Sequence, residues 1–468
     1  MTISVFTLGC KTNLYESGQI VSALNAVGHH AFHGLGAADV FVLNTCAITA
    51  EAEKKSRQLV ARARKLNPKC RIVVVGCASE KNPEQFTKLP NVVLVKGVAG
   101  KTKVVDAILA FDCADKGVCD QKKAYVCENL SQNTSEKEQF AQSEVAVDGL
   151  NDETSEDKTN SATVDLETVP STYEESTVST QEHTRAFVKI QDGCNNFCTY
   201  CIVPYLRGRS RSRKIDEIVT EVKSANAAET VITGIDISQF GRDTGETLPQ
   251  LFEALSDVNT RLRLGSLEAG VVTDDVLAVL TKTNFCPHFH LSLQSGCDAT
   301  LKRMNRKYTT AQYASAVEKI RKIFPAAAIT TDVIVGFCGE TDEEFAQTMQ
   351  FVKEINFADV HVFPYSPRQG TVACRWKDTD PVVKHARAEQ LGQLKQQLKH
   401  NFALFNKGMK QPVLVEEIVD GMAVGYTPNY LRVYFEGTVC DIGRVVVVEI
   451  GEPFRDGATA FRGVDGHI

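Results

Sequence analysis

Three cysteines stand within eight residues of one another, at Cys194, Cys198 and Cys201, directly after an apolar run from Ala186 to Ile190. Thiolates at this spacing can all turn inward from one loop onto a soft metal centre. A structural zinc site needs a fourth cysteine or histidine nearby, and none follows before Cys286. Most iron–sulfur clusters also take four thiolates. The loop therefore suggests a cluster with one iron open to a non-protein ligand; a zinc-site fragment or neighbouring buried thiols are the alternatives.

The composition indicates the class of protein and the cellular compartment. Its 468 residues allow two to four domains, and 43% hydrophobic with 24% charged residues is typical of a globular protein. No apolar run approaches the ~20 residues of a membrane helix, and the N-terminus lacks the pattern of a signal peptide. Fifteen cysteines without an export signal indicate a reducing cytoplasm and metal chemistry rather than disulfides. We therefore expect a cytoplasmic protein with no membrane partner.

The first 110 residues alternate between apolar runs and helical patterns. Asn13, with Glu16 three residues later, matches a capping pair for the first helix. The apolar runs are typical of buried parallel strands. They are Ile3–Leu8, Val40–Leu43, Ile72–Val75 and Val92–Val95. We expect residues 1–111 to form a small doubly wound, flavodoxin-like α/β domain.

Single cysteines follow three of these strands. Cys10 follows the first strand, Cys46 the second and Cys77 the third, and glycines precede two of them, at Gly9 and Gly76. In such sheets ligands collect outside the carboxyl ends of the strands, and glycine lets the backbone approach closely. Three thiols placed in this way can converge on one point. This favours a second cluster site over three unrelated buried cysteines.

Residues 112–184 differ in composition from the rest of the chain. Polar and acidic residues dominate, and from 129 to 184 the only basic side chains are Lys137 and Lys158. Such a segment buries too little apolar surface to offset the entropy of ordering it. We interpret residues 112–184 as an acidic, disordered linker. Outside residues 129–184 the chain is net positive, which permits a polyanionic partner.

Six further strand-like runs follow, separated by helical patterns. They are Ala186–Ile190, Thr230–Thr233, Leu262–Ser266, Phe289–Leu293, Ile329–Val335 and Asp359–Phe363. Repeated strand–helix units of this length form a barrel or partial barrel of parallel strands. We therefore expect a partial (β/α)6 barrel over residues 185–407. The three-cysteine loop follows its first strand and so lies at the carboxyl ends, where parallel barrels keep their chemistry.

Polar residues and glycines follow the later strands at the same end and describe a polar pocket facing the cluster. They are Gly234, Asp236, Ser266, Glu268, Gln294 and Pro364. Four arginines also lie beside this mouth, at Arg207, Arg209, Arg211 and Arg213. Exposed cations usually only contact water, but this density next to a metal loop favours contact with phosphate.

Residues 408–468 carry short strand-like runs with alternating apolar residues. The runs are Val413–Val419, Met422–Tyr426, Leu431–Phe435 and Val445–Ile450. This pattern predicts a small closed β-barrel. Such barrels often bind oligonucleotides, and a purely structural addition is nearly as well supported by the pattern.

Several of these motifs resemble one known family. The spacing Cys194-x3-Cys198-x2-Cys201, with Tyr200 before the last thiol, resembles the cluster loop of radical S-adenosylmethionine enzymes. The N-terminal cysteines, in Leu-Gly-Cys-Lys-Thr-Asn, Asn-Thr-Cys and Val-Gly-Cys, resemble the methylthiotransferase branch. The C-terminal barrel resembles the RNA-binding TRAM domain of that branch. The resemblance covers nearly all of the chain except the acidic linker.

Within the branch, four stretches are most similar to the subgroup that modifies N6-threonylcarbamoyladenosine beside the anticodon of tRNA. They are Leu8–Asn13, Arg207–Ser212, and His290–Gly296 with Leu301–Thr309. Relatives that act on isopentenyladenosine in tRNA, or on an aspartate of a ribosomal protein, usually differ there. Those two activities are the alternatives within the same chemistry. A zinc-stabilised RNA-binding adaptor with structural thiols is the alternative without catalysis.

The resemblance implies an enzyme with two [4Fe–4S] clusters. The first, on Cys194, Cys198 and Cys201, would bind S-adenosylmethionine and give a radical that removes hydrogen from C2 of the modified adenine. The second, on Cys10, Cys46 and Cys77, would carry the sulfur that is methylated and passed to the base. Contacts to S-adenosylmethionine would come from Tyr200, Gly234, Asp236, Ser266, Glu268, Gln294 and Pro364. The four arginines would contact the substrate.

The resemblance also implies partners. The substrate is tRNA, and the first cluster requires an electron donor such as a flavodoxin or a ferredoxin. The second cluster requires a source of sulfur. We expect the enzyme to be a monomer.

Overall fold

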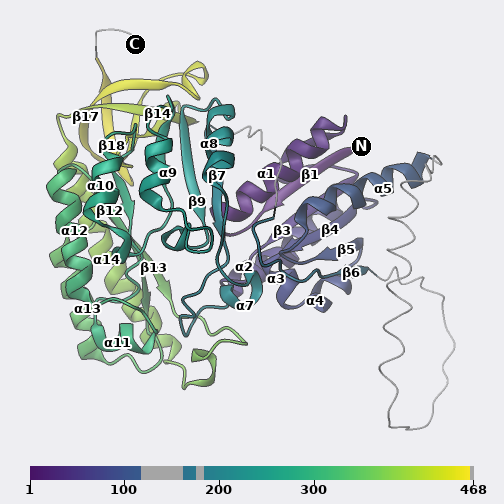
Figure 1. Ribbon diagram of the computed structural model, residues 1–468, viewed down its shortest axis with the longest axis horizontal. Helices are drawn as coiled ribbons and strands as arrows, with labels where there is room; N and C mark the ends of the chain where they lie inside the picture. The colour runs from purple at the N-terminus through teal and green to yellow at the C-terminus, as the bar shows by residue number, and fades with distance from the viewer. Residues whose placement is uncertain (117–161, 175–183, 464–468) are drawn as a thin grey trace. The chain divides into compact units, whose positions relative to one another are not determined.

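The computed structural model describes residues 1–116, 162–174 and 184–463, which form a mixed α/β fold with parallel sheets and a closed β-barrel (Figure 1). The described residues divide into two compact units. The first holds the residues up to Pro170 with Glu174, and the second holds Ser171–Tyr173 with the residues from 184 onwards. Among the described helices, none combines the length and the apolar character needed to cross a membrane.

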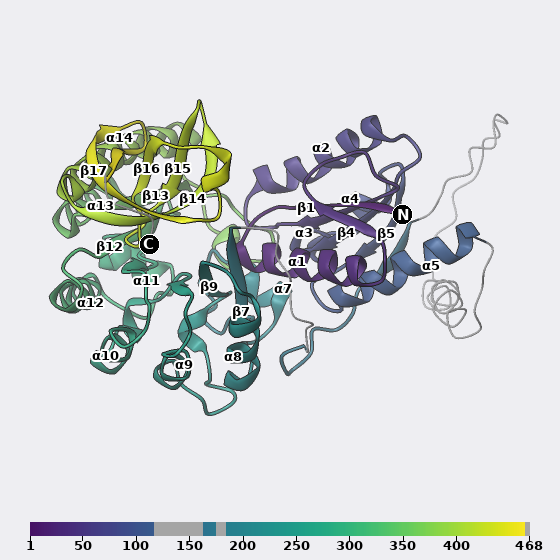
Figure 2. The same cartoon turned by 90° about the horizontal axis from the view of Figure 1, so that it is seen from above.

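The first unit is built on a six-stranded sheet in the order β2-β1-β3-β4-β5-β6, in which every neighbouring pair is parallel. Its strands are β1 (Thr2–Thr7), β2 (His30–His33), β3 (Val40–Thr45), β4 (Arg71–Gly76), β5 (Val92–Lys96) and β6 (Thr163–Asp165). Its longer helices are α1 (Lys11–Ala26), α2 (Ala50–Leu66) and α5 (Val104–Lys116), and its short ones are α3 (Cys77–Lys81) and α4 (Glu84–Thr87). Figure 2 shows α1 and α5 on one face of the sheet and α2 on the other. Covered faces explain why the central strands are apolar throughout.

Two expectations for this unit are wrong. Asn13 does not cap α1, which begins at Lys11; its side-chain amide donates instead to the carbonyls of Leu8 and Thr45. The segment expected to be a linker contributes to the fold, because α5 continues to Lys116 and β6 pairs with β5. The other residues of that expected linker, 117–161 and 175–183, lie outside the described residues.

The acidic residues of β6 explain its place in the sheet. The ammonium group of Lys96, which is buried, lies 2.5 Å from Asp165 and 2.9 Å from Glu167. A buried cation requires such partners. The acidic composition that suggested a disordered segment therefore neutralises a lysine of the sheet.

The second unit contains six parallel strands in the expected order. They are β7 (Arg185–Asp192), β9 (Glu229–Gly234), β10 (Arg261–Leu264), β11 (His288–His290), β12 (Ala328–Val335) and β13 (Asp359–Pro364). They form two sheets, β10-β9-β7-β8 and β11-β12-β13, which isolated parallel bridges such as Leu267↔Leu291 connect. The short β8 (Arg211–Ser212) pairs antiparallel with β7 and was not expected. The partial barrel is thereby confirmed.

Helices separate these strands and cover the apolar side of the barrel. They are α7 (Val203–Arg207), α8 (Ile215–Ser224), α9 (Leu248–Ala254), α10 (Asp274–Leu280), α11 (Asp298–Arg303), α12 (Thr310–Ile323), α13 (Asp342–Ile355) and α14 (Pro381–Asn406). Capping boxes at Thr309 and Thr341 define the starts of α12 and α13. The main core joins strand residues such as Val333 to helix residues such as Leu391.

The chain ends in a closed five-stranded barrel with the strand order β14-β15-β16-β18-β17. The strands are β14 (Lys410–Val419), β15 (Met422–Tyr426), β16 (Arg432–Glu436), β17 (Val445–Phe454) and β18 (Gly457–Arg462). The first four match the expected runs. The fifth gave no clear pattern, because its core residues are the small Ala458 and Ala460.

A buried carboxylate at the start of β9 organises the end of the barrel opposite to the cysteine loop. The Glu229 carboxylate lies 2.8 Å from Arg185, 2.6 Å from Arg261 and 2.7 Å from Arg263. Burial alone would raise the pKa of Glu229. Hydrogen bonding from Arg263 and the charges of all three arginines outweigh that effect and lower the pKa from 4.5 to about 2.

The same arginines bind the C-terminal barrel. Arg263 donates hydrogen bonds to the carbonyls of Thr427 (3.3 Å) and Pro428 (3.0 Å), and Arg261 donates to the carbonyl of Pro412 (3.0 Å). A buried guanidinium group needs several acceptors at once. Glu229 therefore orients the groups that join the C-terminal barrel to the strands of the (β/α) barrel.

We expect Glu229→Gln to lower the apparent free energy of unfolding by about 3 to 5 kcal/mol, because three largely buried guanidinium groups lose their shared anion. Urea unfolding followed by circular dichroism measures this change. The control Glu253→Gln, in an exposed pair with Lys282, should cost less than about 1 kcal/mol. An equal cost for the two variants would contradict the assignment.

The same contribution depends on pH. Folding lowers the pKa of Glu229 from 4.5 to about 2. Its stabilising effect is therefore complete above pH 4.5 and is lost as the pH falls towards 2. We expect the difference in stability between wild type and Glu229→Gln to narrow across that window.

Candidate functional site

The three-cysteine loop begins directly after β7. Gly193 has φ +70°, and a Cβ atom there would lie 2.0 Å from the carbonyl oxygen of Arg209, so only glycine fits. The Cys194 N–H donates to the carbonyl of Gly208 (3.1 Å), and the Ser210 N–H donates to the Asn195 side chain (3.2 Å). The segment after α7 thus holds the loop at the carboxyl end of β7.

The three thiols stand on one short loop, Cys194–Cys201. Burial and the nearby Asp236 carboxylate raise the pKa of Cys194, and the Cys198 and Cys201 thiols add to that rise. Soft donors gathered on one short loop fit an iron–sulfur cluster with one iron left for another ligand. Iron binding requires the thiolates, so cluster formation releases their protons.

Two carboxylates face the loop from the ends of the next strands. The Asn196 side-chain amide donates to Asp236 (2.8 Å) and to Glu268 (3.0 Å). Gln239 donates to both Asn196 (3.0 Å) and Asp236 (2.8 Å). Asp236 also lies 3.5 Å from the Cys194 sulfur. The loop, β9 and β10 therefore present acidic oxygens beside the thiols, where a ligand ammonium group could bind.

One arginine balances these acidic groups. Arg306 donates to the sulfur of Cys198 (3.2 Å) and to the phenol of Tyr308 (3.1 Å), and it lies 2.8 Å from Glu268. Burial raises the pKa of Glu268, whereas the charge of Arg306 opposes that rise. Tyr308 donates in turn to the Leu293 carbonyl (2.7 Å). This chain of contacts fixes a positive charge beside a cysteine of the loop.

Of the other residues expected in the pocket, Tyr200 lies in the cysteine loop, and the remaining four end or follow strands. Tyr200 packs edge-on against Phe337, with ring centroids 6.3 Å apart. Gly234 is the last residue of β9 and Pro364 the last of β13. Ser266 and Gln294 follow β10 and β11. The hydrogen bonds that join the loop to Asp236 and Glu268 do not include these five residues.

The arginine run does not form the open basic surface that its composition suggested. Arg207 is 1% exposed and donates two hydrogen bonds of 3.1 Å to Asp192. Arg211 is buried 3.6 Å from Asp192, and Arg213 is buried against Glu221. Buried cations need such partners.

Three of the four arginines are thus buried beside carboxylates of the protein. The interpretation of the run as a phosphate-binding surface is therefore corrected: Arg207, Arg211 and Arg213 do not form one. Arg209 is exposed, with its guanidinium 4.4 Å from the centroid of the Phe197 ring. Arg209 alone keeps the expected accessibility.

The N-terminal cysteines also lie where parallel strands end. Strand register pairs Thr7 with Asn44 and Thr45 with Gly76, so Cys46 and Cys77 follow paired positions. A Cβ atom on Gly9 would lie 2.7 Å from the Cys46 sulfur, which places this thiol against the residue before Cys10. The three cysteines therefore collect at one edge of the sheet.

Buried polar side chains hold this edge together. Asn44 donates to the carbonyl of Asn13 (2.9 Å) and accepts a hydrogen bond from Lys101 (3.2 Å). Lys101 forms a buried ion pair with Glu16. Asn13 ties Leu8 to Thr45 through its amide, as described above. The loops that carry Cys10 and Cys46 are thus connected through α1.

Sequence reasoning missed Asn196, Gln239 and Arg306 as members of the first site. Asn196 stands inside the cysteine loop, and Arg306 lies in a stretch that was singled out for its family resemblance. Gln239 had no such signal. A polar residue within a metal loop, such as Asn196, can be expected to belong to the site. The contact of Arg306 with Cys198 could not be expected, because it depends on how the chain folds after β11.

Comparison with known proteins identifies the family. A model described as Radical SAM superfamily matches residues 188–352, and one described as Uncharacterized protein family UPF0004 matches residues 2–97. The threonylcarbamoyladenosine tRNA methylthiotransferase MtaB of Bacillus subtilis is 35% identical, over 97% of this chain and 96% of that protein. The chain belongs to the radical S-adenosylmethionine tRNA methylthiotransferases.

Two further similarities concern a relative named for another nucleoside and a solved structure of similar fold. The tRNA-2-methylthio-N(6)-dimethylallyladenosine synthase of Thermoanaerobacter pseudethanolicus is 32% identical, over 95% of this chain and 89% of that protein. The solved radical S-adenosylmethionine methyltransferase TsrM of Kitasatospora setae has a TM-score of 0.51 at 13% identity, covering 78% of this chain and 77% of that one. At this identity the likeness concerns the fold alone.

Family membership decides several of the expectations. This methylthiotransferase is a transferase of the radical S-adenosylmethionine type, with a [4Fe–4S] cluster and S-adenosylmethionine as cofactors. The interpretation as a zinc-stabilised adaptor without catalysis is therefore wrong. The three thiols after β7 fit such a cluster, because they provide soft donors for three irons and leave one open.

We expect Arg306→Gln to make the reduction potential of this cluster more negative by about 60 mV, the equivalent of a tenfold change for one electron. Reduction adds negative charge, which Arg306 stabilises through its contact with Cys198. A redox titration followed by electron paramagnetic resonance measures the shift. Arg303→Gln, which removes an arginine paired with Glu344, is the control and should leave the potential unchanged; equal potentials for both variants would refute this role.

Proposed function

We propose that this methylthiotransferase modifies C2 of N6-threonylcarbamoyladenosine in tRNA, next to the anticodon. The observation that carries the proposal is the occurrence of two groups of three cysteines, each gathered at the carboxyl ends of parallel strands. The similarity to a relative named for this nucleoside, at 35% identity over nearly the whole chain, supports the choice of substrate.

In this proposal Cys194, Cys198 and Cys201 hold the [4Fe–4S] cluster. When bound, the cluster supplies the electron that cleaves S-adenosylmethionine and so provides a radical able to take hydrogen from an unactivated aromatic carbon. Asp236 and Glu268 accept hydrogen bonds from the ammonium group of S-adenosylmethionine. The contacts of both carboxylates with Asn196 hold them beside the cluster.

The remaining pocket residues take the outer parts of the cofactor in this proposal. Tyr200 excludes water on the side of Phe337, where burial raises its pKa and keeps the phenol neutral. Gly234 lets the chain after β9 pack closely, because a Cβ atom there would lie 2.8 Å from Ile237. Ser266, Gln294 and Pro364 offer polar groups and backbone carbonyls at the ends of β10, β11 and β13.

A second [4Fe–4S] cluster on Cys10, Cys46 and Cys77 is the proposed source of the sulfur. These residues fit such a group, because Gly9 lets the backbone before Cys10 pack against the Cys46 thiol. An electron donor such as a flavodoxin or ferredoxin would serve the first cluster, and a separate sulfur source the second. Arg209 and the C-terminal barrel are the proposed contacts to tRNA.

Nucleoside analysis tests the substrate. The enzyme is expressed in a bacterial strain that lacks its own methylthiotransferases, and digested tRNA is analysed by mass spectrometry. We expect 2-methylthio-N6-threonylcarbamoyladenosine to form. The methylthio derivative of isopentenyladenosine in its place would support the second candidate, which the 32% identical relative favours. The absence of a methylthio group from both nucleosides would contradict both candidates.

Single cysteine variants test the two cluster sites separately. We expect Cys77→Ala to retain cleavage of S-adenosylmethionine and to lose the methylthio product at least about 100-fold, because sulfur supply and radical formation use different cysteines. Cys198→Ala should lose both activities. Chromatography of 5′-deoxyadenosine and of nucleosides measures them.

The matched control is Cys70→Ala, since Cys70 is buried just before β4, at the opposite end of that strand from Cys77. It should retain both activities. Full formation of methylthio product by Cys77→Ala would exclude the N-terminal cluster.

A further inference from the structure

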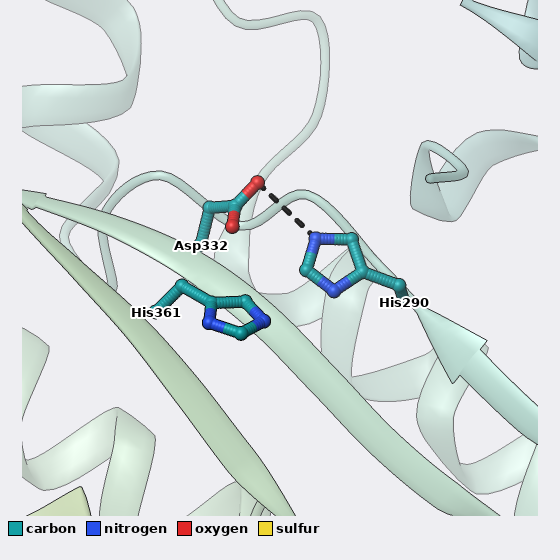
Figure 3. A group of neighbouring side chains, drawn as sticks. All are labelled: His290, Asp332 and His361. Atoms are coloured by element: carbon teal, nitrogen blue, oxygen red, sulfur yellow. Dashed lines mark ion pairs between the residues drawn. The ribbon is translucent and has the colours of Figure 1, made fainter. Parts of the chain in front are cut away.

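Three potential metal ligands meet on the sheet β11-β12-β13. Strand register pairs His290 with Thr330 and Asp332 with His361. Residues two apart on a strand share a face, so Thr330 and Asp332 point the same way. His290, Asp332 and His361 therefore lie on one face of three consecutive strands, as Figure 3 shows.

This face is the accessible side of the sheet. The alternate residues of β12, Ile329, Val333 and Val335, belong to the main core and are at most 1% exposed. By contrast, His361 is exposed, and His290 and Asp332 are partly exposed. An ion or a small ligand can thus reach the three polar side chains.

The distances suit a single small ion. One ligand atom from each side chain lies within 4.8 Å of the others, and the His290 Nε2 atom is 3.1 Å from the Asp332 carboxylate. Ligands around a tetrahedral zinc ion are about 3.3 Å apart when the bonds are 2.0–2.1 Å long. His290 and Asp332 already have this separation. The ligand atom of His361, which is exposed, lies within 4.8 Å of both.

The surroundings prepare both imidazoles to act as ligands. The Nδ1 atom of His290 lies 3.0 Å from the hydroxyl of Thr330, which directs Nε2 towards Asp332, as the outer partners of metal-bound histidines do. The His361 ring lies beside the His290 ring, with the two imidazole centroids 5.5 Å apart.

We propose that His290, Asp332 and His361 bind one divalent first-row transition-metal ion of the zinc class. Two imidazoles and a carboxylate leave at least one coordination position for water or for an oxygen of a bound substrate. The donors are nitrogen and oxygen, so the site is chemically distinct from the cysteine clusters. It lies within one unit and does not rest on the proposed function.

The test uses the full-length enzyme with its iron–sulfur clusters reconstituted, so that the cluster thiols are occupied. After dialysis against a chelator, Zn²⁺ is added and the bound zinc is measured, followed by X-ray absorption at the zinc edge. We expect one bound zinc with nitrogen and oxygen ligands at about 2.0–2.1 Å and imidazole scattering. Sulfur ligands at about 2.3 Å, or no zinc retained, would overturn the proposal.

Two variants assign the site to these residues. We expect His361→Ala and Asp332→Asn each to weaken zinc binding at least about 100-fold, because each removes a direct ligand. His361 is exposed, and asparagine keeps the shape of aspartate, so both variants should fold. The control His385→Ala, at an exposed position of α14, should bind zinc as wild type does. Wild-type affinity in both ligand variants would refute the site.

Discussion

The common direction of neighbouring strands is the constraint on which both cysteine groups depend. Parallel strands end at one edge of a sheet, so residues that follow different strands meet there although they are far apart in the sequence. Cys46 and Cys77 follow the paired positions Thr45 and Gly76 in this way. Cys194 reaches Asp236 by the same rule, since β7 and β9 are parallel neighbours. Each site is therefore a consequence of sheet topology.

Buried ion pairs then give these edges a fixed shape. Asp192 lies 2.6 Å from Lys189 and 3.1 Å from Arg207, which fixes the segment against which the cysteine loop rests. Glu229 has the same role for the C-terminal barrel. Such pairs contribute less to stability than to the choice of one arrangement, because their desolvation offsets much of their attraction. We infer that these ion pairs position the cysteine loop and the C-terminal barrel on the strands of the (β/α) barrel.

The order of the elements and the positions of the cysteines were predictable from local pattern. Apolar runs identified the strands of the three sheets and of the C-terminal barrel, except β2, β6, β8 and β18, which are short or lack large apolar residues. The sequence could not show that Asp165 and Glu167 neutralise Lys96, since that pairing spans about seventy residues. An acidic composition predicts disorder only when no buried cation requires the acidic groups.

The sequence by itself determined the radical S-adenosylmethionine class of this protein, because the spacing of Cys194, Cys198 and Cys201 is a local property of the chain. Only the tertiary structure decided which charged groups remain accessible. Arg207 and Arg209 stand two residues apart in one basic run, yet the first is buried on Asp192 and the second is exposed. The meeting of His290, Asp332 and His361 was also hidden in the sequence. Register between strands sets such contacts, and register depends on the packing of the whole sheet.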